Sequence, residues 1–340
     1  MNNNGGNYIK ISENRDHTID ALRGLGIILV MLGHLNPDEY ILKYIYSFHM
    51  FLFFFISGFL AHRRTDTFWH YTVIRFNRLL IPFFFWNCAS LCIDAVWLHN
   101  SDCSNYFMQL FFLRGAVSWN SPVWFLAVSF WLDIVLFGLM KTGRGVRWIT
   151  ICLCSGIWAV ISSRGKVLPF GLHILPIAIV FALLGQEYKV FDIETSLSKR
   201  SKYALIVIAL LVNILLGVTC SDLISVYHMK YTNYLFVIFS GLMGILFWMI
   251  LIGELVALKK GLILLEEYGR HTILILCTHY WIYLIMQIIG GKWYGVDLWH
   301  MKSTPKALAI WIIVCSIYWM VFKVYDILAA KYRGIRYVLG

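Results

Sequence analysis

Long apolar runs separated by short polar segments recur along the whole chain. A membrane-spanning helix needs about 20 mostly apolar residues, and these runs approach that length. The pattern therefore predicts an all-α polytopic integral membrane protein with about ten transmembrane helices. We place them at 19–36, 45–61, 79–98, 122–140, 148–163, 168–185, 203–220, 234–256, 272–289 and 307–323.

The remaining segments are short. The apolar run at 106–113 is too short to span a bilayer and is expected to form a re-entrant or interfacial helix. The polar start of the chain does not have the basic and apolar regions of a cleavable signal peptide, so the first helix is expected to be retained. We predict a cytoplasmic tail at 1–18, one transmembrane domain at 19–325 and a cytoplasmic tail at 326–340.

Charge orients these helices. Asp, Glu, Lys and Arg make up 14% of the chain, against about 25% in ordinary globular proteins. Of the 29 Lys and Arg residues, 21 fall in segments on the side of the two termini. Basic residues accumulate on the cytoplasmic side of membrane proteins, so both termini are expected to be cytoplasmic. The net charge of +11 then reflects orientation among membrane lipids and does not indicate a nucleic-acid partner.

The eight cysteines contribute little to the functional interpretation. Most fall in apolar helices, where Cys behaves as a small buried residue. Cys152 and Cys154 have the wrong spacing for a structural zinc site, and no metal is expected. Cys103 and Cys220 both fall outside, and whether they form a disulfide is open.

The first predicted helix carries two ionisable residues, Arg23 and His34, which are costly inside a membrane. Their separation of eleven residues turns the helix by about 1100°, which leaves the side chains roughly 20° apart and about 16 Å apart along the axis. Asp20 lies one turn before Arg23. Surface snorkelling explains either residue alone, but the pair on one face suggests a site that extends along the helix.

Four motifs lie in order along the chain. They are Asp20–Gly24 with His34 ten residues beyond Gly24, the aromatic run Phe48–Leu60, the segment Arg75–Pro82, and Tyr268–Thr272 leading to His279. Together they resemble the membrane-bound acyltransferase 3 family, and the resemblance covers essentially the whole chain. The first two motifs are the most specific.

The resemblance implies an O-acyltransferase of the bacterial cytoplasmic (inner) membrane. Such proteins transfer an acyl group, usually acetyl, from cytoplasmic acyl-coenzyme A to an extracytoplasmic acceptor, commonly a sugar hydroxyl. The expected partners are acyl-coenzyme A and a glycan or lipid-linked sugar, with acetyl-CoA as donor substrate and no permanently bound cofactor. Because the chain ends soon after its last predicted helix, we expect it to lack the extracytoplasmic hydrolase-like domain of some members.

The residues can be given roles on this hypothesis. Arg75 and Arg78 are i and i+3 at the cytoplasmic start of the third helix, so they share a face and suit phosphate recognition. Arg23 lies deeper and is expected to hold the pyrophosphate or the pantetheine arm. His34 is the expected catalytic residue, either as general base toward the acceptor hydroxyl or as a histidine that is acylated first.

Five further residues are weaker candidates for binding the acceptor or supporting the site, and Asp20 beside Arg23 is one of them. His49 is either a residue that orients the acceptor or His34, or an interfacial histidine, and Ser57 is expected mainly to permit close packing. His279 lies inside the membrane, where it either lines the site or forms a structural hydrogen bond. Trp119 is a candidate for stacking on the acceptor.

Two other functional classes compete with this one. A transporter would use Arg23, His34 and His279 as a substrate or proton path, although the chain does not show the repeated halves of many transporters. A non-catalytic scaffold would leave the intramembrane charges unexplained. The acceptor, the acyl chain length and the oligomeric state are not determined by the sequence.

Overall fold

The structure is a computed structural model of the full chain. It describes 16–96, 108, 110, 119–165, 167–192, 196–231, 233–258, 262–294, 302–332 and 334–335. The predicted helix at 106–113 lies almost entirely outside the described residues, as does Cys103.

The described residues are organised as helices. In chain order these are α1 (His17–His34), α2 (Glu39–Leu60), α3 (Phe68–Arg75), the π-helix η1 (Phe76–Leu80), α4 (Ile81–Val96), α6 (Trp124–Leu139), α7 (Arg144–Ser163), α8 (Leu175–Phe191), α10 (Lys199–Ile214), the π-helix η5 (Leu215–Thr219), α11 (Tyr234–Ala257), α12 (Ile263–Arg270), α13 (Thr272–Tyr294) and α14 (Thr304–Lys331).

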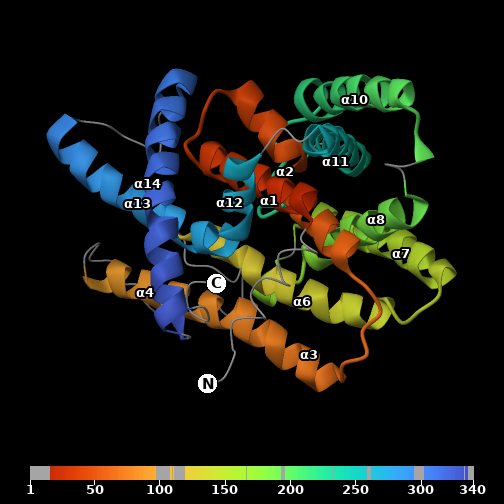
Figure 1. The fold of residues 1–340 in the computed structure, drawn as a ribbon, viewed down its shortest axis with the longest axis horizontal. Helices are drawn as coiled ribbons and strands as arrows, with labels where there is room; N and C mark the ends of the chain where they lie inside the picture. The colour runs from red at the N-terminus through yellow and green to blue at the C-terminus, as the bar shows by residue number, and fades with distance from the viewer. Residues whose placement is uncertain are drawn as a thin grey trace, which may run out of the picture.

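Nine helical segments among the described residues are long and apolar enough to cross a membrane. Helix α1 corresponds to the first of the ten predicted spans and is not among these nine. It carries the charged residues Asp20 and Arg23. It lies at the centre of the helix assembly in Figure 1, and most of its residues are buried against other helices. The predicted all-α polytopic membrane fold is confirmed.

Several predicted helix limits were wrong. The third span begins at Phe68 in place of residue 79, because η1 joins α3 and α4 into one continuous helix. Helix α12 was not predicted, since its eight residues are too short and polar to stand out as a span. Helix α14 extends to Lys331, beyond the predicted limit at residue 323.

Helix α1 crosses α12 with the two backbones in direct contact. A Cβ at Gly24 would overlap the Leu265 carbonyl, and a Cβ at Gly269 would overlap the Asp20 carbonyl. Small residues of this kind permit the closest approach of membrane helices. The crossing lies at the centre of the molecule in Figure 1 and brings Arg23 near the start of α13, since Arg23 and Thr272 line the same cavity.

A second crossing of the same type joins α2 and α8. A Cβ at Gly58 would overlap the Ala182 carbonyl, and one at Gly185 would overlap the Phe55 carbonyl. Earlier on both helices, Phe51 of α2 stacks on Phe181 of α8, with ring centroids 4.2 Å apart. The aromatic run of α2 therefore packs into the core through these contacts, while Ser57 lines the site described below.

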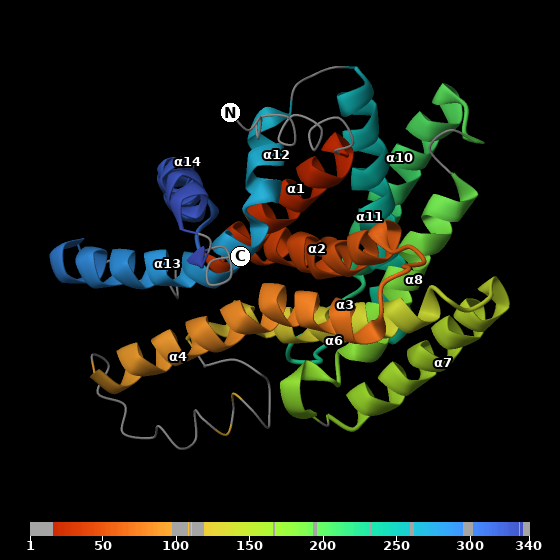
Figure 2. The ribbon, with the colours of Figure 1, turned by 60° about the horizontal axis from the view of Figure 1, so that its bottom comes forward.

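The other helices surround these two crossings. Figure 2 shows the long α3–α4 helix running beside α6 below α2, with α7 next to α8 at one end and α10 next to α11. Helices α13 and α14 occupy the opposite end. The site described below lies between α1, α2, α3, α6 and the α12–α13 junction.

Candidate active site

A cavity of about 350 Å³ opens between the start of α1, the end of α2 and one face of α6. By the predicted orientation this is the cytoplasmic end of the protein. Five of its lining residues are arginines and two are aspartates, which gives the lining side chains an excess of three positive charges. The charged lining residues are Arg23, Arg64, Arg75, Arg78, Arg270, Asp20 and Asp133.

Two of these arginines come from the junction of α3 and η1. Arg75 ends α3, and Arg78 lies within the π-helical turn that follows. A π-helical turn widens the helix locally and is often found at functional sites. Both side chains line the cavity, as the i, i+3 spacing predicts.

Asp133 of α6 is the acidic residue at the centre of these arginines. Its Oδ2 lies 3.2 Å from Arg75 Nε. The two groups form an ion pair, but their geometry is not that of a hydrogen bond. The charges of Arg23, Arg64 and Arg78 also act on this carboxylate. Among the described residues Arg78 forms no ion pair of its own. Asp133 therefore holds one arginine and leaves positive charge available to an anion.

Arg23 lines the inner part of the cavity and lies 3.9 Å from Asp20, which is buried one turn earlier on α1. At 3.9 Å the two charges attract each other weakly. Because the side chain of Arg23 is 31% exposed, it can still contact a ligand in the cavity.

At the mouth of the cavity, two arginine side chains lie against the ring of Tyr71. The guanidinium groups of Arg64 and Arg75 lie 5.1 and 5.0 Å from the Tyr71 ring centre, within the range of cation–π attraction. Arg64 also pairs with Asp66 in the loop after α2. This hydrogen bond from Arg64 lowers the pKa of the Asp66 carboxyl. The loop thereby presents Arg64 to the cavity in a fixed position.

The inner end of the cavity is closed by aromatic and aliphatic side chains. Phe53 and Phe125 line it and pack edge to face, with ring centroids 5.6 Å apart. On α13 the last lining residue is Leu276, three residues before His279. About one helical turn of protein thus separates the cavity from the histidines beyond it.

Beyond this closure lies a group of three histidines. His34 Nδ1 is 3.0 Å from His279 Nε2, and the two rings are inclined by only 13°. His49 lies close enough for its charge to affect His34. His49 and His279 are almost completely buried, whereas His34 is partly exposed. The only group of the three with some solvent access is therefore the predicted catalytic residue.

Aromatic residues surround the histidine pair. The Tyr280 ring contacts His34 edge-on at 4.9 Å, and its side chain is hydrogen-bonded to Ser121 at the start of the α6 segment. Trp119 donates a hydrogen bond to the Ser90 carbonyl and contacts Trp281 at 5.2 Å. This aromatic wall lies at the His34 end of α1, opposite the arginines.

The structure separates the predicted site residues into two sets. Asp20, Arg23, Ser57, Arg75 and Arg78 line the arginine cavity, and Ser57 donates its hydroxyl to the Phe53 carbonyl. The other set consists of His34, His49 and His279 with Trp119 nearby, and none of these lines the cavity. Because α1 is an unbroken helix, it connects the sets over the predicted rise of about 16 Å.

Three site residues were missed by the sequence analysis. Asp133 and Tyr71 contact the arginines, and Tyr280 contacts His34. The signal for Asp133 was present, since a carboxylate inside an apolar helix is as costly as the arginine and histidine that were noticed. Tyr71 and Tyr280 gave no comparable signal, because tyrosine is common in membrane helices.

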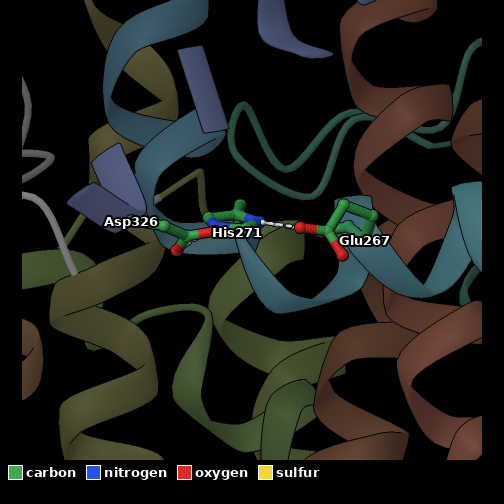
Figure 3. A group of neighbouring side chains, drawn as sticks. All are labelled: Glu267, His271 and Asp326. Carbon is green, nitrogen blue, oxygen red and sulfur yellow. Dashed lines mark hydrogen bonds and ion pairs between the residues drawn. The ribbon is translucent and has the colours of Figure 1, made fainter. Parts of the chain in front are cut away.

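A separate polar group lies just behind the cavity, at the junction of α12 and α13. Figure 3 shows Glu267 and Asp326 at opposite nitrogens of the buried His271 ring, at 3.6 Å from Nδ1 and 3.2 Å from Nε2. Arg270, which lines the cavity, pairs with Glu267 at 2.9 Å. His271 Nδ1 also lies 3.0 Å from the Glu267 backbone carbonyl, and Nε2 is hydrogen-bonded to Asp326, so His271 joins α12 to α14.

Comparison with known proteins identifies the family. The model of the acyltransferase 3 family, described as an acyltransferase domain, matches residues 16–325. Nodulation protein NolL of Sinorhizobium fredii is 33% identical over 183 residues, which are 49% of this chain and 46% of that relative, so the matched region spans about half of its length. No solved structure matches the chain. Because the family match extends from the start of α1 into the last helix, the chain belongs to the acyltransferase 3 family of membrane proteins.

Proposed function

We propose that this protein is a membrane O-acyltransferase that takes a short acyl group, acetyl by family default, from cytoplasmic acyl-coenzyme A. The acceptor is a sugar hydroxyl of an extracytoplasmic or lipid-linked glycan. One observation carries the proposal: five arginines line a cavity at one end of α1, and a hydrogen-bonded histidine pair lies at the other end of the same helix.

The arginine cavity suits the anionic part of the donor. Coenzyme A carries several phosphate charges, and guanidinium groups bind phosphate through forked hydrogen bonds. Arg75 and Arg78 come from one helix and Arg23 from another, so they contact a phosphate group from different sides. The pantetheine arm would then extend from Arg23 past Phe53 toward His34, a route that requires the Phe53 and Phe125 side chains to move.

His34 is the group proposed to act on the thioester. As general base it accepts the proton of the acceptor hydroxyl while the oxygen attacks the thioester carbonyl. The C–S bond breaks, and the thiolate recovers a proton to leave as coenzyme A. Acylation of His34 followed by transfer to the hydroxyl gives the same products. Both routes use one unprotonated ring nitrogen of His34.

The proposed acceptor binds at the aromatic wall on the far side of the membrane. Trp119 lies there with Trp281 and Tyr280, and aromatic rings suit the apolar faces of sugars. The name of the matched relative, a nodulation protein, does not state an acceptor for this chain. We propose a surface glycan or its lipid-linked precursor.

The test is transfer of label from acyl-coenzyme A to glycan. Membranes containing the wild-type protein are supplied with [¹⁴C]acetyl-CoA, and surface glycans are isolated and analysed by mass spectrometry. We expect acetylated glycan in these membranes and none above background with His34→Ala at equal protein level. The absence of labelled glycan with the wild-type protein, together with flux of an unmodified solute, would instead support a transporter.

A further inference from the structure

The hydrogen bonds of the histidine pair determine where its protons lie. His279 Nδ1 is 2.8 Å from the backbone carbonyl of Ile275. A carbonyl oxygen only accepts, so Nδ1 of His279 must carry the proton. A neutral imidazole has one N–H, which leaves His279 Nε2 as an acceptor.

The second bond follows from the first. His34 Nδ1 lies 3.0 Å from this acceptor nitrogen, so it must be the donor. In neutral His34 the other nitrogen, Nε2, is then unprotonated. His49 has the same backbone anchor, with Nδ1 donating to the Ile45 carbonyl over 2.7 Å, but no hydrogen bond joins it to His34 among the described residues.

We infer that His279 is a positioning residue that fixes His34 in the tautomer with a free Nε2, the nitrogen that attacks or accepts a proton. The Ile275 carbonyl fixes the proton of His279 on Nδ1, and the acceptor Nε2 of His279 in turn fixes the proton of His34 on Nδ1. This inference rests on the proposed acyl transfer, for which it names the reacting atom.

The arrangement differs from an imidazole oriented by a carboxylate. A carboxylate would place a negative charge beside the base, whereas His279 offers a neutral acceptor on an apolar helix. When His34 Nε2 takes the acceptor proton, the Nδ1–H bond to His279 remains and spreads the positive charge. The proton then passes from Nε2 to the departing thiolate, and both histidines return to their starting tautomers.

Two tyrosines pack against the rings of His34 and His279. Tyr280 contacts both rings edge-on, at 4.9 Å for His34 and 5.0 Å for His279. Tyr283 contacts His279 at 5.7 Å and donates its hydroxyl to the Met31 carbonyl, which joins α13 to α1. These contacts restrain both rings in the plane that the hydrogen bond requires.

The direct test reads the tautomers without using acyl transfer. The full-length protein, labelled with ¹⁵N-histidine, is reconstituted in lipid bilayers and studied by solid-state NMR at neutral pH. The His34 signals are assigned by their absence in His34→Gln. We expect protonated Nδ1 and bare Nε2 for both His34 and His279. A protonated Nε2 on neutral His34 would overturn the inference.

The functional test compares two replacements of His279. His279→Gln supplies an amide oxygen that can accept from His34, while His279→Met has similar size and no such acceptor. We expect His279→Met to lower kcat by about 10²- to 10⁴-fold with unchanged KM for acyl-CoA, and His279→Gln to recover most of the loss. Equal kcat values for the two variants, or wild-type kcat in His279→Met, would overturn the inference.

A matched control is the same change at another buried histidine. His173 is fully buried and does not line the cavity, and its Nδ1 lies 3.3 Å from the backbone of Leu168, so His173→Met is expected to keep wild-type kcat. If the wild-type protein transfers no acyl group while NMR shows the expected tautomers, the proposed function fails and the assignment of protons stands. The two failures are therefore distinguishable.

Discussion

The two ends of α1 meet their neighbours in opposite ways. At the Arg23 end, five arginines line an open cavity. Four of them lie beside a carboxylate, and among the described residues Arg78 has no ion pair. At the His34 end, imidazoles and aromatic rings are packed together. His34 bonds to His279, and His49 and His279 bond to backbone carbonyls.

This difference indicates that the two ends of α1 have different roles. A cavity lined by five arginines is suited to holding a polyanion, because Arg78 has no ion pair among the described residues and an anionic ligand would supply its counter-charge. Imidazoles that have no charged partner are suited to proton transfer, because their protons can move without breaking an ion pair. The predictions below separate donor binding at one end from chemistry at the other.

The largest effect is expected from His34→Ala. Removal of the proposed reacting nitrogen should lower kcat by at least about 10³-fold, the range for loss of a general base or nucleophile. The KM for acyl-CoA should change less than twofold, since His34 does not line the cavity. Steady-state kinetics in reconstituted bilayers measures both, and a kcat within tenfold of wild type would contradict the role.

At the other end, Arg78→Met should act on donor binding. Loss of a charge-assisted hydrogen bond to phosphate corresponds to about 1.5–3 kcal/mol, or roughly 10- to 100-fold in KM for acyl-CoA. Arg164→Met is the matched control, since Arg164 lies at the end of α7 on the opposite side and does not line the cavity. A similar rise of KM in both variants would show that general charge, and not the cavity, binds the donor.

The helix crossing that joins the two ends can be tested by Gly24→Ala. The added methyl group meets the Leu265 carbonyl, so α1 and α12 must separate, at a cost of about 1–3 kcal/mol in unfolding free energy. Gly156→Ala on α7 is the control, because a Cβ there meets nothing within 4 Å. Thermal unfolding in detergent should show a lower Tm for the first variant only. Equal Tm values would contradict the close backbone contact.

The smallest effect is expected at the rim. The Arg64–Asp66 hydrogen bond lowers the pKa of Asp66, so the ion pair is present above the ordinary pKa of 3.8 and is lost as pH falls through the lower folded value. Asp66→Asn should therefore raise KM less than threefold at pH 7, as exposed ion pairs contribute little. The pH–KM profile above pH 5 should match wild type, and a divergence there would contradict this assignment.

The sequence was sufficient to predict the helices and one half of the site. Hydropathy located the long helices, because a span requires a continuous apolar run. The i, i+3 spacing of Arg75 and Arg78 placed both on one face, and the rise of α1 set the separation of Arg23 from His34. Each of these properties is local to a single helix.

The other half depends on packing between distant helices. The bond between His34 and His279 joins residues 245 positions apart, and no spacing rule relates them. The glycine contact between α12 and α1 is likewise a tertiary property, which the short and polar sequence of α12 does not indicate. The closure at Phe53 and Phe125 likewise arises between α2 and α6. A single sequence does not specify such pairings.

The most direct test that donor binding and chemistry lie at different ends of α1 is coenzyme A binding to purified protein in bilayers, measured by isothermal titration calorimetry. The account predicts that His34→Ala binds coenzyme A with a Kd within twofold of wild type while its transfer activity is lost, and that Arg78→Met loses about 10- to 100-fold in Kd. A loss of binding in His34→Ala as large as that in Arg78→Met would contradict it.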